Sequence, residues 1–240
     1  MRNISEHLRT HVLECMDFER ELPDEELREL IVREMTHLEN IERLSIKDRL
    51  YLEQRVFNSL RKLDILQELL EDDTVTEIMV NGPRNVYFEK NGSFHKSPHE
   101  FASEEKLQDV IQQIVGRHNR VVNMSSPIVD TRLEDGSRVN VVLFPISIDG
   151  SAISIRKFSK TALDMDTLVE VGTVTREVAE FLKNLVTCRY NLFISGGTSS
   201  GKTTFLNALS GYIPKEERII TIEDSAELRL QGVKNIVRLE

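Results

Sequence analysis

The chain has 240 residues, of which 40% are hydrophobic and 30% charged, and this composition is typical of a soluble globular protein. Its formal net charge of −9 argues against a general nucleic-acid binder, which needs a basic surface, although a local basic patch is compatible with it. No segment approaches the roughly 18–20 apolar residues of a membrane span, and the start of the chain is too charged for a signal peptide.

Residues 1–70 are predicted to form helices, because they contain no glycine and only one proline, Pro23. Ser45 and Asp48 form a weak capping box that opens a helix running to about Leu60, and residues 64–72 continue the helical pattern. In the preceding segment, the apolar residues at helical spacing are Leu27, Leu30, Ile31, Met35 and Leu38. The mixed charges indicate a solvated bundle surface.

Residues 71–160 change to short alternating strands and are predicted to form a small α+β domain. Asn91-Gly92 and Asp135-Gly136 are hairpin turn signals between such strands. Between the two hairpins, residues 103–119 are predicted to form a helix capped by Ser103, and residues 151–158 form one more strand. A polar stretch, residues 161–173, is predicted to be a linker.

Residues 174–240 are predicted to begin an α/β domain. An amphipathic helix over residues 175–190 presents one apolar face, made by Val178, Phe181, Leu182, Leu185 and Val186. A strand over residues 191–196, a glycine-rich loop, a helix and a strand over residues 218–224 follow. This is the strand–loop–helix–strand order of an α/β unit.

The loop carries the spacing Gly196-x-x-x-x-Gly201-Lys202-Thr203, which is a P-loop. Glycines allow backbone N–H groups to point at phosphate oxygens, and the following helix places its positive dipole end there. Lys202 would reach the β- and γ-phosphates of ATP, and the Thr203 hydroxyl would ligate Mg²⁺. The predicted nucleotide-binding residues are Gly196, Gly197, Thr198, Ser199, Ser200, Gly201, Lys202, Thr203 and Thr204. The alternative is a glycine-rich turn without a ligand.

Two further sets of charged residues are weaker candidates. Glu223 and Asp224 end an apolar run, where carboxylates beside a P-loop could align water or Mg²⁺, or could simply form an acidic turn. Arg132, Arg138 and Arg156 could stabilise charge on a γ-phosphate, although their spacing alone is that of ordinary strand-surface residues.

Five stretches resemble the ATPases of type II and type IV secretion systems, most closely the CpaF-like branch of tight-adherence (Tad/Flp) pilus assembly. They are EIMVNGPRNVYFEKNG, RLEDGSRVNVVLFPISIDG, ISIRKF, NLFISGGTSSGKTTFLNAL and RIITIEDSAELRL. The resemblance covers about residue 50 to the end of the sequence. It implies a PAS-like α+β domain joined to the start of a RecA-like ATPase domain, after a less diagnostic helical region.

The same resemblance implies roles for single residues. Glu223 matches an acidic position where a glutamate activates water. Arg138 and Arg156 match arginines that reach the γ-phosphate, and Arg132 is a weaker match for that role. We therefore expect catalytic contributions from Glu223, Lys202, Arg138 and Arg156.

The family also implies partners and a location. We expect a homo-hexamer that acts on an inner-membrane platform protein of a secretion or pilus machine, at the cytoplasmic face of the membrane. Direct nucleic-acid binding is not expected, because the chain is acidic. Cys15 and Cys188 lie far apart and outside any metal-ligand cluster, which agrees with a reduced, cytoplasmic protein.

One departure from the family pattern is large. The family continues with a Walker B segment and a histidine box, whereas this sequence ends at Glu240. We therefore expect a fragment of a longer ATPase that binds nucleotide weakly and hydrolyses it poorly.

Two other function classes remain open at this stage. A GTPase or nucleotide kinase would share the P-loop, but no NKxD-like base-reading segment is present in these residues. A non-catalytic chain in which residues 1–160 act as a docking module is the second alternative.

Overall fold

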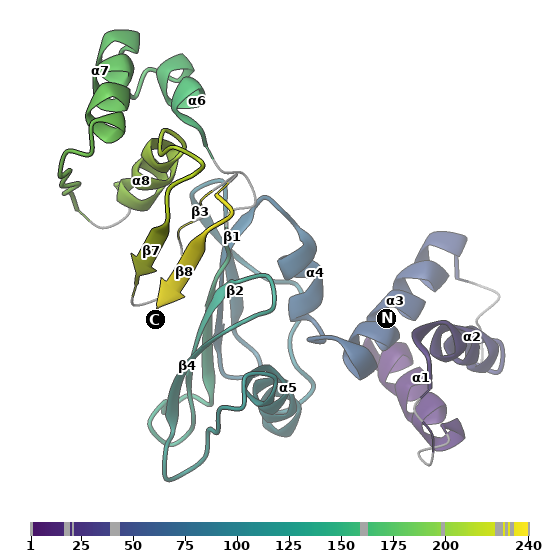
Figure 1. Ribbon diagram of the computed structural model, residues 1–240. Coiled ribbons are helices and arrows are strands. Elements are labelled where there is room, and N and C mark those ends of the chain that lie inside the picture. Colours follow the sequence, from purple (N-terminus) through teal and green to yellow (C-terminus); the bar gives the residue numbers. More distant parts are fainter. Residues whose placement is uncertain are drawn as a thin grey trace. The chain divides into compact units, whose positions relative to one another are not determined.

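The structure is a computed structural model that describes every residue except 1, 17–19, 21, 39–43, 159–162, 198–199, 224–227, 229, 231–232 and 240. The chain divides into two compact units, residues 1–157 and residues 158–240 (Figure 1). The first unit contains a helical bundle and an α+β domain.

The helical bundle consists of α1 (Arg2–Cys15), α2 (Asp24–Met35) and α3 (Ile46–Arg61). Its own hydrophobic core is made by Leu8, Val12, Leu22, Leu27, Leu30, Ile31, Met35, Leu52, Val56 and Phe57. The predicted capping box is confirmed, because the Ser45 hydroxyl accepts from the Asp48 N–H while the Asp48 carboxylate accepts from the Ser45 N–H.

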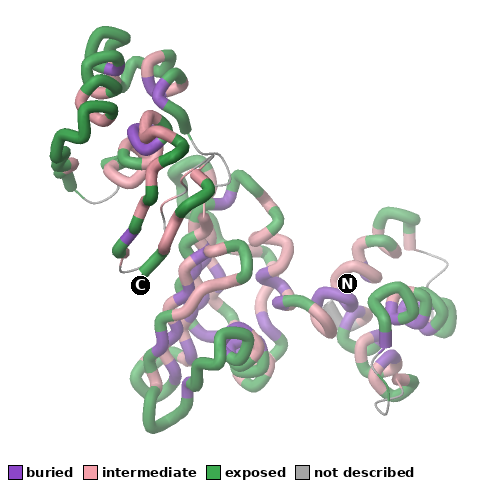
Figure 2. The backbone as a smooth tube through the Cα atoms, viewed as in Figure 1, coloured by how far each residue is buried: buried purple, intermediate pink, exposed green. Residues whose placement is uncertain are grey.

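The α+β domain is an antiparallel sheet with helix α5 (Glu104–Gly116) against one face (Figure 1). Its strands are β1 (Val75–Asn81), β2 (Val86–Lys90), β3 (Ser93–Lys96), β4 (Ile128–Arg132), β5 (Arg138–Val142) and β6 (Ala152–Arg156), in the spatial order β3-β2-β1-β6-β5-β4. Alternate strand residues such as Ile78, Val139 and Ile155 are buried with α5, and Figure 2 shows buried positions along these strands. The opposite face carries polar residues such as Glu77, Asn140 and Ser154.

The predicted turns of this domain have the backbone that glycine favours. Asn91 and Gly92 both take positive φ, at 52° and 73°, as a tight two-residue hairpin turn requires. Gly136 has a φ of 88° in the second hairpin. The Ser103 hydroxyl accepts from the Lys106 N–H and caps α5, as predicted.

Helix α4 (Leu66–Glu71) was predicted as part of the helical region, but it packs with the sheet. Leu66 is fully buried in the core of the α+β domain, together with Leu63 and Ile65 from the preceding turn. The change from one core to the other therefore falls near Lys62, at the end of α3.

The second unit has α6 (Met165–Glu170), α7 (Arg176–Thr187) and α8 (Lys202–Ser210), with β7 (Ile219–Ile222) and β8 (Ile236–Leu239) paired in parallel. The buried residues of its core are Met165, Leu168, Ala179, Ala208 and Leu209. Strand β8 was not predicted from the sequence.

Three expectations for this unit differ from the structure. Residues 165–170 of the predicted linker form α6, because Met165 and Leu168 are apolar and pack into the core. Residues 191–196 form no strand, since neither β7 nor β8 pairs with them, and Phe193 is 97% exposed. Helix α7 buries Ala179 and packs Leu182 and Val186 on the core, whereas Val178 and Phe181 of its predicted apolar face are exposed.

Candidate functional site

The glycine-rich loop leads directly into α8, as the P-loop pattern predicts. Gly201 is the residue before the helix and has a φ of 87°, in the left-handed region that favours glycine. As the residue before the helix, Gly201 has no side chain with which to cap it. The first N–H groups of α8 are therefore directed toward the loop, which is the arrangement that suits an anion.

At Gly196 the feature that favours glycine is space. A Cβ atom at this position would lie 2.6 Å from the Ser200 Oγ atom. The Ser200 hydroxyl itself donates to the Gly197 carbonyl at 2.9 Å. A side chain at Gly196 would therefore displace the Ser200 hydroxyl from its position.

Lys202 turns back over the loop. Its Nζ atom donates to the Gly196 carbonyl at 3.0 Å and also to the Gly197 carbonyl. The ammonium group is thereby held above the loop backbone, where a phosphate would compete with the carbonyls as its partner. This position fits the role predicted for Lys202.

The remaining loop residues fit magnesium nucleotide in part. Thr203 and Thr204 lie half-buried in the first turn of α8, whereas Thr198 and Ser199 lie outside the described residues. Within the described ranges, no group of three or more His, Cys, Asp or Glu residues is arranged to hold a metal ion. A Mg²⁺ ion bound through one hydroxyl and the phosphates of its nucleotide needs no such group, so Thr203 remains a suitable ligand.

Glu223 directly follows β7, and its backbone N–H donates to the Leu239 carbonyl at 3.1 Å. Its Oε2 atom accepts from the Leu228 N–H at 3.0 Å. In this arrangement the carboxylate contacts the backbone of a residue five positions further along the chain. Its role in positioning water stays a prediction. Asp224 lies outside the described residues.

The sheet register brings the three candidate arginines together. Arg132 is the cross-strand partner of Arg138, and Arg138 is the partner of Arg156. All three alternate with core residues, so they share the face opposite α5. Strands lie about 4.8 Å apart, so the row spans roughly 10 Å. Because like charges on neighbouring strands repel, a bound anion would stabilise this row.

Glu77 extends the row, and the sequence reasoning did not single it out. It is the cross-strand partner of Arg156, on the same face of the sheet. Its alternation with the buried Ile78 and Val80 along β1 was the sequence signal that places Glu77 on the polar face of the sheet. Only the register shows that this acidic residue adjoins the arginines.

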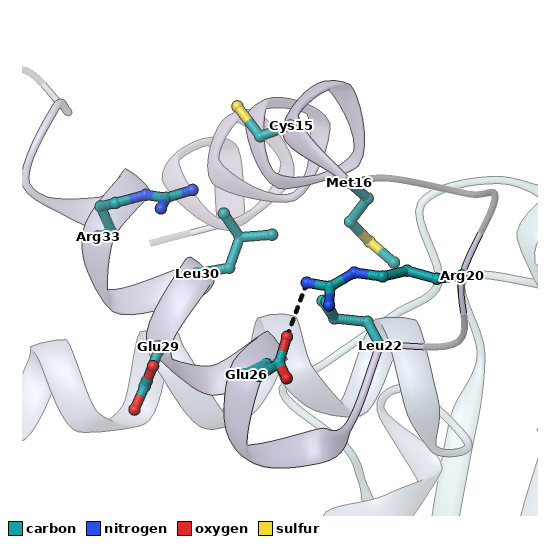
Figure 3. A pocket seen from close by; sticks show the side chains of 8 residues that line it. All are labelled: Cys15, Met16, Arg20, Leu22, Glu26, Glu29, Leu30 and Arg33. Atoms are coloured by element: carbon teal, nitrogen blue, oxygen red, sulfur yellow. Dashed lines mark hydrogen bonds and ion pairs between the residues drawn. The ribbon is translucent and has the colours of Figure 1, made fainter.

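A separate pocket of about 420 Å³ lies in the helical bundle (Figure 3). Arg20 and Glu26 line it and form an ion pair of 2.8 Å, and Leu22 and Leu30 supply apolar lining. Its further lining residues are Cys15, Met16, Glu29 and Arg33. None of the predicted functional residues lines it, so it is distinct from the phosphate-binding loop.

Comparison with known proteins agrees with these features. The family described as Type II/IV secretion system protein matches residues 59–240. The chain belongs to this family. The match begins near the end of α3 and includes the α+β domain, the arginine row and the P-loop.

Individual relatives support the assignment. An uncharacterized protein of Methanocaldococcus jannaschii is 36% identical over 189 residues, which are 74% of this chain and 25% of that protein. The type IV secretion system protein PtlH of Bordetella pertussis is 30% identical over 198 residues, covering 74% of this chain and 58% of that protein. The chain thus spans only part of these relatives' lengths.

A solved structure shows a similar fold. The pilus retraction motor PilT, crystallised with bound ADP, is 19% identical, with a TM-score of 0.53 over 74% of this chain and 51% of that chain. Within the described parts of the chain, no helix combines the length and apolar character needed to cross a membrane.

Proposed function

We propose that this chain is the nucleotide-binding part of a secretion or pilus-assembly ATPase that binds Mg-ATP through its P-loop. One observation carries the proposal: Lys202 Nζ lies over the carbonyls of the glycine-rich loop, at the start of α8. Family membership and the PilT structure with bound ADP agree with it.

The chemistry of the loop follows from its parts. Backbone N–H groups of the loop and of α8 would hold the β-phosphate, and Lys202 would exchange its carbonyl partners for phosphate oxygens. Thr203 would contribute its hydroxyl to Mg²⁺, which neutralises phosphate charge when bound. The helix N-terminus favours the same negative charge.

The family resemblance supports a proposed catalytic role for the arginines as well. Arg138 and Arg156 would meet the γ-phosphate and stabilise the negative charge that spreads over its oxygens during transfer, with Arg132 extending the row. Glu223 would align the attacking water once it releases the Leu228 N–H. We infer that ATP hydrolysis drives a movement of a PAS-like domain against a RecA-like domain.

For the finer assignment we propose a Tad-type pilus-assembly motor of the CpaF-like branch. It would act as a homo-hexamer on a platform protein at the cytoplasmic face of the inner membrane. The support is the resemblance of residues 77–92 and 191–230 to that branch. Relatives with other printed roles, such as type IV secretion, show that the family includes several machines.

Equilibrium binding of Mg-ATP by the full chain tests the proposal. We expect Lys202→Ala to weaken binding by about 10- to 100-fold, because a hydrogen bond to a charged group contributes about 1.5–3 kcal/mol. Lys215→Ala is the matched control, since Lys215 is an exposed lysine outside the loop. Equal affinity of Lys202→Ala and the parent chain would contradict the proposal.

Two extensions separate the alternatives. A GTPase would prefer GTP over ATP in competition, whereas the proposed motor prefers ATP or binds both alike. Arg156→Gln should weaken ATP binding more than ADP binding, because only ATP presents the γ-phosphate. Partner binding that survives Lys202→Ala would favour the remaining alternative, a docking module.

A further inference from the structure

The helical bundle and the α+β domain have separate hydrophobic cores. The bundle core ends with Val56 and Phe57 of α3, and the sheet core begins at Leu63. Lys62, between them, is exposed and has an extended backbone, with φ −120° and ψ −160°. The two parts of the first unit are therefore joined covalently by a short turn.

Polar groups, by contrast, bridge the two parts. The Tyr51 hydroxyl on α3 lies 3.0 Å from His99 Nε2, in the segment between β3 and α5. Arg55 Nη1 donates to the same hydroxyl at 3.3 Å. His99 also lies 3.8 Å from the Glu68 carboxylate of α4. One imidazole thus contacts both parts.

A second set of contacts lies along the same boundary. Lys106 Nζ on α5 donates to the Ser59 carbonyl of α3 at 3.0 Å. Asp64, in the turn between α3 and α4, interacts electrostatically with Lys106 and with Arg9 of α1. We call Tyr51, Arg55, Ser59, Glu68, His99 and Lys106 the polar seam.

We propose that the polar seam is a reversible joint, and that protonation of His99 releases the helical bundle from the α+β domain. The inference depends on the structure of the first unit and is independent of the proposed function. A polar contact between two separate cores can open without exposing either core, so opening costs less than unfolding.

The charges around His99 give the direction of the effect. Burial lowers the pKa of His99 below its ordinary value of 6.5, the Arg55 guanidinium lowers it further, and Glu68 opposes both. We call the bundle docked when it contacts the α+β domain through the polar seam. The docked state therefore favours the neutral imidazole of His99. The released ring binds a proton more readily, so docking is complete above about pH 6.5 and weakens as the pH falls below it.

Two other groups at this boundary, Asp64 and Lys106, also have shifted pKa values, but their ordinary pKa values lie outside the range from pH 5.5 to 7.5. Burial raises the pKa of Asp64 from 3.8, so its contribution to docking weakens as the pH rises, which is the opposite sense. Burial lowers the pKa of Lys106 from 10.5. His99 is the seam residue whose ordinary pKa lies between pH 5.5 and 7.5. For one proton, the docking equilibrium changes by at most about tenfold per pH unit.

Fluorescence energy transfer on the full chain tests the joint. One dye is attached to the exposed Cys15 of α1, and the other to the cysteine of Ser125→Cys, with Cys188→Ser removing the second native thiol. We expect one narrow distance distribution at pH 7.5 and a second, broader population at pH 5.5. Circular dichroism at both pH values verifies that the helices stay folded.

Three variants make the result specific. His99→Gln should remove the pH response, because the amide does not titrate. Tyr51→Phe should give the broad population at higher pH than in the parent chain, since it loses only the hydroxyl contact. His118→Gln, at an exposed histidine of the same unit, should behave as the parent.

Two results would overturn the proposal. One is a distance distribution that is identical at pH 7.5 and 5.5 in the parent chain. The other is a pH response that persists in His99→Gln. Mg-ATP binding measured on the same variants separates this inference from the proposed function, because neither His99 nor Tyr51 is among the proposed nucleotide-binding or catalytic residues.

Discussion

The α+β domain and the second unit contain similar apolar runs, but they bury them very differently. Ile153 and Ile155 in β6 are fully buried between neighbouring strands and α5. In the second unit, Ile222 of β7 is 81% exposed, and no residue of β7 or β8 belongs to its described core. An apolar run becomes a buried strand only when paired strands and a covering helix are both present.

The largest effect should come from the buried strand. Ile155→Ala should lower the free energy of unfolding of the first unit by about 2–5 kcal/mol, because it leaves a cavity beneath α5. The matched change Ile222→Ala should alter stability by less than about 0.5 kcal/mol, since the side chain is exposed. Urea unfolding followed by circular dichroism measures both. Similar losses in the two variants would show that β7 is covered in solution.

A smaller effect on stability is expected at two glycines that both have a left-handed backbone. Gly92 and Gly201 have φ values of 73° and 87°, and a Cβ atom at either would meet nothing within 4 Å. Alanine at each position should therefore cost only the left-handed conformation, about 1–2 kcal/mol. Thermal unfolding measures this cost.

Nucleotide binding should distinguish these two glycines. If the left-handed backbone strained by Gly201→Ala relaxes by distorting the loop, this variant should bind Mg-ATP about 5- to 30-fold more weakly. Gly92→Ala should leave the affinity for Mg-ATP unchanged. Equal affinities in the two variants would contradict a phosphate-binding loop. Calorimetric titration with Mg-ATP gives the answer.

The smallest effect concerns a surface ion pair in the α+β domain. Lys90 Nζ contacts the Asp72 carboxylate at 2.8 Å. The hydrogen bond from Lys90 lowers the pKa of Asp72 below 3.8, and Thr74 adds to this. The stabilisation is present above pH 3.8 and is lost as the pH falls through the lower folded value. It should be small, because the pair is exposed.

Replacing the lysine tests this assignment. Lys90→Met should raise the pKa of Asp72 toward its ordinary value in an NMR titration of the carboxyl carbon. Lys96→Met is the control, since Lys96 lies on the neighbouring strand and its Nζ donates to Asn85. If the pKa of Asp72 is unchanged in Lys90→Met, the lowering of that pKa would be assigned to Thr74 alone.

The sequence predicted local structure well where one short segment carries all the information. The Ser45 and Ser103 caps, the Asn91-Gly92 turn and the helix after Gly201 all depend on residues within a few positions of one another. The P-loop was predicted for the same reason. Residues 191–196 were not, because a strand depends on a distant partner that no local pattern identifies.

The arginines show the same limit within the candidate site. The sequence alone presents Arg132, Arg138 and Arg156 as ordinary strand residues. Their alignment beside Glu77 follows from the register of four strands. The roles of these side chains in catalysis remain predictions, as does that of Glu223.

The sequence by itself determined the turns, the caps and the glycine-rich loop, because backbone sterics and short hydrogen bonds act over a few residues. Only the tertiary structure decided which strands pair, which apolar residues are buried and which charges adjoin. It separated the bundle core from the sheet core and placed His99 beside Tyr51, 48 positions apart in the sequence. Contacts between distant segments depend on how whole elements pack, and no local pattern encodes that packing.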